Sequence, residues 1–293
     1  MSLSLYRGAF CVAGAALLWG TAGTAQTFLD GSLLSPLWVG ALRLVFAVLF
    51  FLPLLISREG SSALKPVEGV CAKYVLACGL AMGAYNLLFF AAMRLSGVAV
   101  GTAIVIGSAP VWACLLEGIW QKEKPTPMRL LGLAVAIFGG GLMATAGRAD
   151  LALDPTGILV CLAAGFAYAS YTVVTKRLVG NVTPLRATTQ SFSIAVLVAL
   201  CAALFFAPWP TLTFSGVSVT LYLGLFTTGV AYLLFSTGLK SLRASTGVAL
   251  SLLEPVTAFL LAVTVAGEAV TGTAVVAMGL LLVGLFIVLR AEG

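Results

Sequence analysis

The stretch LSLLEPVTAFLLAVTVAGEAVT, residues 250–271, decides the fold expected for this sequence. It is an apolar segment with a proline near its middle, followed by a glycine and a glutamate. The same arrangement occurs 145 positions earlier, which indicates an internal duplication. The matched pairs are Pro110 with Pro255, Glu123 with Glu268, Thr126 with Thr271 and Gly139 with Gly284.

Composition places the chain in a membrane. Of 293 residues, 61% are hydrophobic and 9% are charged, whereas soluble domains carry about 25% charge. The net charge of +6 comes from short basic runs between apolar segments, which favours loops at an anionic leaflet over a nucleic-acid-binding stripe. The 6 cysteines form no CxxC pair and there is no histidine, so we expect no disulfide framework, no metal site and no enzyme.

Ten apolar windows are long enough to cross a bilayer, which takes roughly 20 helical residues. The first could instead be a cleaved signal peptide, since Arg7 precedes it. However, Trp19 in that window matches Tyr168 in the sixth at an offset of 149, which favours a permanent helix. The windows are residues 8–28, 36–57, 71–93, 98–120, 127–146, 155–175, 185–207, 216–239, 245–266 and 271–289.

The basic residues indicate the orientation. With the N-terminus in the cytoplasm, 13 of the 16 Lys and Arg residues fall on the cytoplasmic side, and only Arg94 and Arg148 fall outside. The remaining one, Arg43, lies within the second window. This bias predicts cytoplasmic termini, and we expect a multi-pass protein of a bacterial inner membrane.

Five helices per half is an odd number, so the second half enters the membrane from the opposite face. We therefore expect an all-α integral membrane protein of ten transmembrane helices, arranged as two inverted five-helix repeats at residues 1–150 and 151–293. Chance similarity between apolar helices is the alternative. Matches at Pro36 and Pro184 and at Gly83 and Gly229 favour duplication, because they extend it over further windows.

Pro110 and Pro255 lie near the bilayer midplane. Each lacks an amide hydrogen and releases the carbonyl four residues earlier, on Ile106 and Ser251. Interrupted helices at corresponding places in two halves are typical of a carrier's binding site. The alternative is a structural kink satisfied by nearby hydroxyl groups. The glycines at 139–141 are expected to allow close helix packing rather than to bind phosphate.

Two charges are predicted within the membrane, Arg43 and Glu254, at a depth of about 10 to 14 Å. Such residues usually face the interior of a bundle. They could form a structural ion pair, or Glu254 could titrate and couple proton movement to transport. Glu117 lies nearer the cytoplasmic interface, and we expect it to be solvated.

Aromatic and polar residues near the middle of the windows are candidates for a central cavity that would suit a zwitterion with an apolar or aromatic side chain. Lipid-facing or packed aromatic residues are the alternative for each position. The candidates are Trp19, Tyr85, Asn86, Ser108, Trp112, Tyr168, Tyr171, Thr228, Tyr232, Ser251 and Glu254.

The blocks PVTAFLLAVTVAGEAVT and PVWACLLEGIWQKEKPT, with the opening GAFCVAGAALLWGTAGTA, resemble the two repeats of the drug/metabolite transporter superfamily, EamA type. Within it, the chain looks most like the YddG-type exporters of aromatic and other neutral amino acids. One departure is that Gln26 and Thr27 occupy a region where some relatives carry a lysine. A mechanism that relies on this lysine is therefore in doubt.

The resemblance and the intramembrane pattern together predict a secondary transporter that exports small neutral or aromatic amino acids by alternating access. The chain has no GxxxxGK[ST] phosphate loop, so we expect no ATP-driven step. We expect no cofactor, a small-molecule substrate, the lipid bilayer as surroundings, no nucleic acid and a monomer. A carrier of drugs or nucleotide sugars is the main alternative, followed by a channel and a membrane-embedded enzyme.

Overall fold

The computed structural model describes residues 3–26, 28–29, 34–121, 125–145, 154–265 and 270–292, and within these ranges the chain is helical without strands. The first half comprises α1 (Leu3–Gln26), α2 (Pro36–Glu59), the 3₁₀ turn η1 (Ser61–Leu64), α3 (Val70–Ser96), α4 (Val98–Gln121) and α5 (Pro127–Thr145). The second half comprises α6 (Pro155–Leu178), α7 (Pro184–Phe206), α8 (Phe214–Tyr222), the π-helix η2 (Leu223–Val230), α9 (Ala231–Gly238), α10 (Ala244–Leu250), the 3₁₀ turn η3 (Ser251–Leu253), α11 (Glu254–Thr264) and α12 (Gly272–Arg290).

These helices fall on the ten predicted membrane crossings. In the described part of the chain, 9 helical segments are long and apolar enough to span a bilayer, and Pro127–Met143 is a shorter apolar helix. One crossing, Phe214–Gly238, joins α8, η2 and α9. The largest shift is at α1, which begins at Leu3 rather than at residue 8. The prediction of an all-α membrane protein is confirmed.

Helices α2 and α7 begin where a capping residue precedes proline. Ser35 accepts a hydrogen bond from the amide of Trp38, and Pro36 occupies the first helical turn of α2. In the second half, Thr183 and Pro184 start α7 in the same way. Proline suits the first turn because its missing amide hydrogen would have no helical partner there. The same local signal therefore starts the second helix of each half.

Equivalent helices of the two halves make equivalent contacts with the other half. Helix α3 packs along α6 and α7, and the equivalent rod of η2 and α9 packs along α1 and α2. Likewise α4 packs on α6, and α11 packs on α1. Helices α2 and α7 contact one another, as do α5 and α12. This exchange of partners is what a pseudo-two-fold axis requires, and it supports the inverted repeat.

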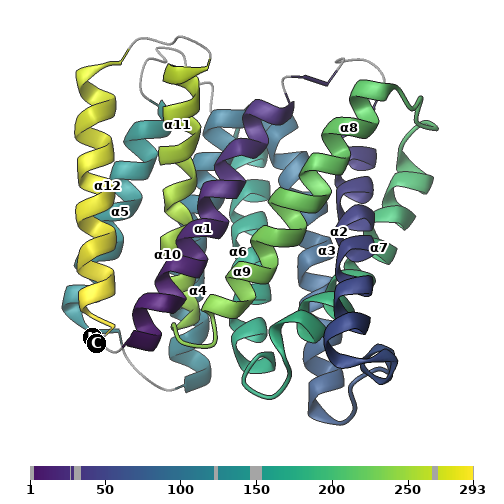
Figure 1. Ribbon diagram of the computed structural model, residues 1–293. Helices are drawn as coiled ribbons and strands as arrows, with labels where there is room; N and C mark the ends of the chain where they lie inside the picture. Colours follow the sequence, from purple (N-terminus) through teal and green to yellow (C-terminus); the bar gives the residue numbers. More distant parts are fainter. Residues whose placement is uncertain are drawn as a thin grey trace.

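Both chain ends lie at the same end of the bundle, where α1 begins and α12 ends (Figure 1). We call this the terminal end, and the other the opposite end. An even number of crossings produces this arrangement. Glu123 and Glu268 of the quoted repeat lie outside the described residues, as do Gly267 and Arg148.

The two midplane prolines behave differently. At Pro255 the helix is interrupted, because α10 ends at Leu250, η3 follows, and α11 begins at Glu254. At Pro110 the expected interruption is absent, since α4 runs through it from Val98 to Gln121. Neighbouring helices can satisfy the groups that a proline frees. Here Gly165 of α6 lies close against Val105 and Ser108, just before Pro110, so α6 packs tightly on this part of α4.

Helices α5 and α12 cross at glycines that are equivalent in the repeat. A Cβ atom placed on Gly139 would lie 2.8 Å from the Ala277 carbonyl oxygen, and one on Gly284 would lie 2.7 Å from that of Gly132. Small residues of this kind let membrane helices approach closely without a hydrophobic driving force. The prediction that the glycine run at 139–141 serves packing is confirmed for Gly139.

Substitution Gly284→Ala is expected to destabilise the protein by about 1–3 kcal/mol, because the added methyl group overpacks the crossing. The measurement is the melting temperature of the purified chain in detergent. Gly279→Ala is the matched control on the same helix, since a Cβ atom at Gly279 meets nothing within 4 Å. Equal melting temperatures for the two variants would contradict the close crossing.

Candidate functional site

A cavity of about 1110 Å³ lies between the two halves of the chain. Its lining comes from α1 to α5 on one side and from α6, η2, α9, η3, α11 and α12 on the other. It extends to the opposite end, where Gln26 ends α1, Pro36 begins α2 and Thr271 caps α12. At the terminal end the halves are in contact, and the Arg177 guanidinium of α6 donates to the Trp120 carbonyl of α4 at 3.4 Å. Among the described residues, the cavity lining therefore reaches the opposite end and not the terminal end.

Four aromatic side chains form the deep part of the cavity. Trp19, Tyr85, Tyr168 and Tyr232 all line it and come from four different helices, α1, α3, α6 and α9. The ring of Trp19 lies 5.0 Å from that of Tyr232 and 6.2 Å from that of Tyr168, and Tyr168 lies 5.2 Å from Tyr85. These separations are typical of favourable aromatic pairs. We call this group the aromatic floor.

Two polar atoms of the aromatic floor have no hydrogen-bond partner among the described residues. They are the indole nitrogen of Trp19 and the hydroxyl of Tyr168, and both are buried. Buried polar groups are almost always hydrogen-bonded in folded proteins, because an unpaired one costs about 1–3 kcal/mol. A polar solute in the cavity could supply these partners.

Arg43 lines the cavity from α2, and α3 holds it in place. Its guanidinium donates twice to the Asn86 side-chain oxygen, at 2.9 and 3.3 Å, and lies 5.6 Å from the Phe90 ring centroid. Asn86 is fully buried and fits only because position 40 is glycine, where a Cβ atom would lie 2.6 Å from the amide nitrogen. The guanidinium is therefore fixed in direction, with donors remaining for a ligand.

A π-helix lies beside Arg43 and was not predicted. Gly224 of η2 packs so closely on α2 that a Cβ atom there would lie 2.9 Å from the Arg43 carbonyl oxygen. Thr227, also in η2, lines the cavity. π-Helices are rare and frequently occur at functional sites. Gly224 and Gly229 in this stretch could have indicated the close approach of another helix. The π-helix itself could not be predicted, because hydropathy does not distinguish π-helical from α-helical geometry.

Glu254 lies at the start of α11, where the ninth crossing is interrupted, and it lines the same cavity as Arg43. Among the described residues no ion pair within 4.0 Å joins the two, since both recorded ion pairs involve Arg129. Arg43 and Glu254 therefore form no direct ion pair in this structure. The reason is geometric, because Asn86 holds the guanidinium on α3.

The structure brings together only part of the predicted set. Arg43, Ser251, Glu254 and Pro255 line the cavity with the aromatic floor. Asn86 accepts a hydrogen bond from Arg43. The ring centroid of Tyr171 lies 5.8 Å from that of Tyr232, and the ring centroid of Trp112 lies 5.5 Å from that of Phe166. Whether any of these residues contacts a substrate stays a prediction. The residues that lie outside the cavity lining are Asn86, Ser108, Pro110, Trp112, Tyr171 and Thr228.

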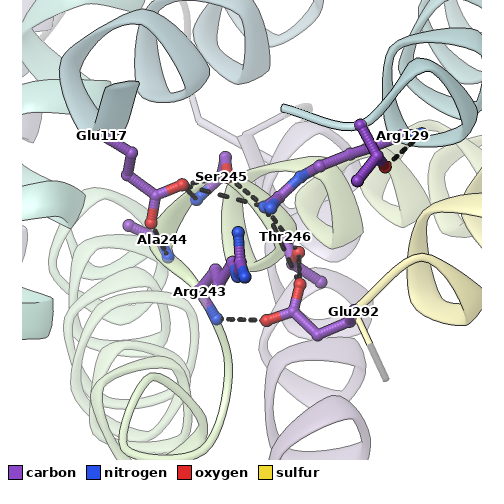
Figure 2. Close-up of polar contacts among 8 residues, drawn as sticks. Glu117, Arg129, Arg243, Ala244, Ser245, Thr246 and Glu292 are labelled. Atoms are coloured by element: carbon purple, nitrogen blue, oxygen red, sulfur yellow. Dashed lines mark hydrogen bonds and ion pairs between the residues drawn. The ribbon is translucent and has the colours of Figure 1, made fainter. Parts of the chain in front are cut away.

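Glu117 is buried, contrary to the expectation that it is solvated. Its carboxylate accepts the amide hydrogens of Ala244 and Ser245 at 2.6 and 3.2 Å (Figure 2). The sequence placed Glu117 near an interface but could not show that α10 begins against it. Arg129, one of the 13 basic residues assigned to the cytoplasmic side, is also buried and lies 3.7 Å from Glu117.

Comparisons with known proteins support a carrier. Residues 6–145 and 155–290 each match the EamA-like transporter family. The chain is 34% identical over 279 residues to the uncharacterized transporter YwfM of Bacillus subtilis, covering 94% of this chain and 92% of that protein. It is 28% identical over 200 residues to a probable terminal-alkyne amino-acid exporter of Streptantibioticus cattleyicolor, covering 66% and 65% of the two chains.

A solved crystal structure shares the fold, with a TM-score of 0.81 and 22% sequence identity over 96% of this chain and 95% of that one. At this identity the likeness concerns the fold alone. The two family matches span nearly the whole described chain and divide at the connection between α5 and α6. On these grounds the chain belongs to the EamA-like transporter family, within the drug/metabolite transporter superfamily.

Proposed function

We propose that this chain is a secondary transporter that exports small neutral or aromatic amino acids and related metabolites by alternating access. One observation carries the proposal: a cation and an anion, Arg43 and Glu254, line the same cavity without pairing with each other. A zwitterion offers a carboxylate to the first and an ammonium group to the second. The aromatic floor then suits an apolar or aromatic side chain.

The energetics favour this assignment. A charge at this depth is expensive unless it faces a partner or a wet cavity. Hydrogen bonds that involve a charged group contribute about 1.5–3 kcal/mol each. A bound zwitterion would neutralise both charges without adding net charge to the membrane interior. The amino-acid exporter of S. cattleyicolor supports the same substrate class by similarity.

We place both termini in the cytoplasm of a bacterial inner membrane, because of the bias of Lys and Arg toward that side. The cavity in this conformation then faces the outside, which is the release side for an exporter. The two halves, residues 1–150 and 151–293, would rock about the pseudo-two-fold axis to expose the same site to the cytoplasm. We expect the monomer to be sufficient, since the cavity is built from one chain.

Carriage of nucleotide sugars fits the cavity less well. Their phosphate groups call for several cations, and the described cavity lining supplies Arg43 at depth and Arg94 near its mouth. The deciding experiment is counterflow in proteoliposomes with a panel of neutral amino acids, nucleotide sugars and cationic drugs. Counterflow of amino acids alone supports the proposal, and counterflow of another class alone overturns it.

Substitution Arg43→Gln is expected to lower amino-acid counterflow about tenfold or more, because it removes a charge-assisted hydrogen bond to the carboxylate. It should also abolish the preference for an amino acid over its carboxamide. Arg94→Gln is the matched control near the mouth and should retain that preference. Retention of the preference in Arg43→Gln would contradict carboxylate binding at this residue.

Substitution Glu254→Gln is expected to lower transport of amino acids about tenfold while sparing des-amino carboxylates, because only the former carry an ammonium group. The measurement is counterflow of each pair of compounds at several pH values. If pH-dependent transport is the same in Glu254→Gln and in the unaltered protein, Glu254 does not carry a coupled proton.

A further inference from the structure

A cluster of charged side chains lies at the terminal end of the bundle, and Figure 2 shows its contacts. Its centre is Arg129 of α5, whose guanidinium lies 3.7 Å from the carboxylates of Glu117 and of Glu292. The same guanidinium donates to the hydroxyl groups of Ser245 and Thr246. Side chains of Arg129, Glu117 and Glu292 are 4%, 8% and 4% exposed, so the ion pairs are shielded from water.

The two carboxylates also hold the beginning of α10. Glu117 accepts the amide hydrogens of Ala244 and Ser245, and Glu292 accepts that of Arg243 at 2.6 Å. The first amides of a helix have no partner within the helix and carry partial positive charge. Carboxylates from other elements satisfy them here, and the Ser245 and Thr246 hydroxyls donate to Glu117 and Glu292.

The cluster joins the two halves of the chain. Glu117 and Arg129 belong to α4 and α5 of the first half, whereas Ser245 and Thr246 belong to α10 and Glu292 follows α12 in the second. The cavity extends to the opposite end and its lining includes none of these five residues. Any motion that opens the terminal end by separating the halves must therefore separate Arg129 from Glu292 and Glu117 from the beginning of α10.

The repeat-equivalent positions at the opposite end carry different side chains. At the repeat offset of 145, the counterparts of Glu117, Arg129 and Ser245 are Ala262, Ala274 and Val100. None of these side chains can form an ion pair. The ion pairs of the charge cluster therefore have no counterpart at the equivalent positions of the repeat. Among these repeat-equivalent positions, the charge cluster is therefore specific to the terminal end.

We propose that Glu117, Arg129, Ser245, Thr246 and Glu292 form a latch that keeps the terminal end shut and breaks once in each transport cycle. Charges suit this role because water enters as the gate opens and solvates them, which offsets the loss of the pairs. The latch sets the resting state to open at the opposite end. This inference rests on alternating access but not on the identity of the substrate.

The test uses reporter cysteines in the full-length chain, with the six native cysteines replaced by alanine. Val248→Cys places a thiol on α10 between the latch and the cavity, at a fully buried position. Thr102→Cys places one in the cavity lining on α4. Labelling by a membrane-impermeant maleimide in proteoliposomes measures the access to each. The native cysteines are Cys11, Cys71, Cys78, Cys114, Cys161 and Cys201.

Arg129→Gln is expected to raise the labelling rate at Val248→Cys about tenfold and to lower that at Thr102→Cys, because the population shifts toward the state open at the terminal end. Arg58→Gln is the matched control, an exposed arginine at the same end and outside the latch. Arg129→Lys should give an intermediate rate, since it keeps the charge but loses the forked geometry.

Opposite changes at the two reporters distinguish gating from damage to the fold. Equal labelling at Val248→Cys with and without Arg129→Gln would overturn the latch. A rise at both reporters would overturn it as well, because it indicates general loosening. Neither readout requires a transported compound. Failure of the latch can thus be told apart from failure of the proposed amino-acid export, which only counterflow measures.

Discussion

The cost of placing charge inside a membrane governs this structure. A charged side chain at the centre of a helix in hydrocarbon costs at least about 2.5–3.5 kcal/mol. Arg43 and Glu254 lie far from both ends of their crossings, so they must face an interior. The two halves provide one by enclosing a cavity. The buried amide of Asn86 then holds the guanidinium, and the aromatic floor completes the lining.

A symmetric scaffold here carries asymmetric chemistry. Helix packing exchanges the halves, and Gly139 and Gly284 make equivalent contacts at the α5 and α12 crossing. The charged residues break the symmetry. At the repeat offsets of 148 and 145, Arg43 corresponds to Ser191 and Glu254 to Ala109. An asymmetric site can bind a solute with distinct ends, and a latch at one end can favour one of two otherwise similar conformations.

Much of the fold was predictable because the bilayer restricts which backbone structures can cross it. Every backbone polar group must be satisfied within the segment, so apolar windows become helices. Local capping signals such as Ser35 with Pro36 set where they begin. Trp19 and Tyr168 were identified as equivalent residues near the midplane, and the structure places both on the cavity. Glu117 was misjudged, because nothing local to it shows that α10 begins beside its carboxylate.

The sequence by itself determined the fold class, the number of crossings, the duplication and the presence of two intramembrane charges. These features can be predicted from hydropathy and from the positions of rare residues within single segments. Only the tertiary structure decided which candidates share a cavity, that α4 continues through Pro110, and that Arg129 joins Glu117 to Glu292. These outcomes depend on contacts between segments far apart in the chain. Each such contact is set by how whole helices pack, and no local pattern encodes that packing.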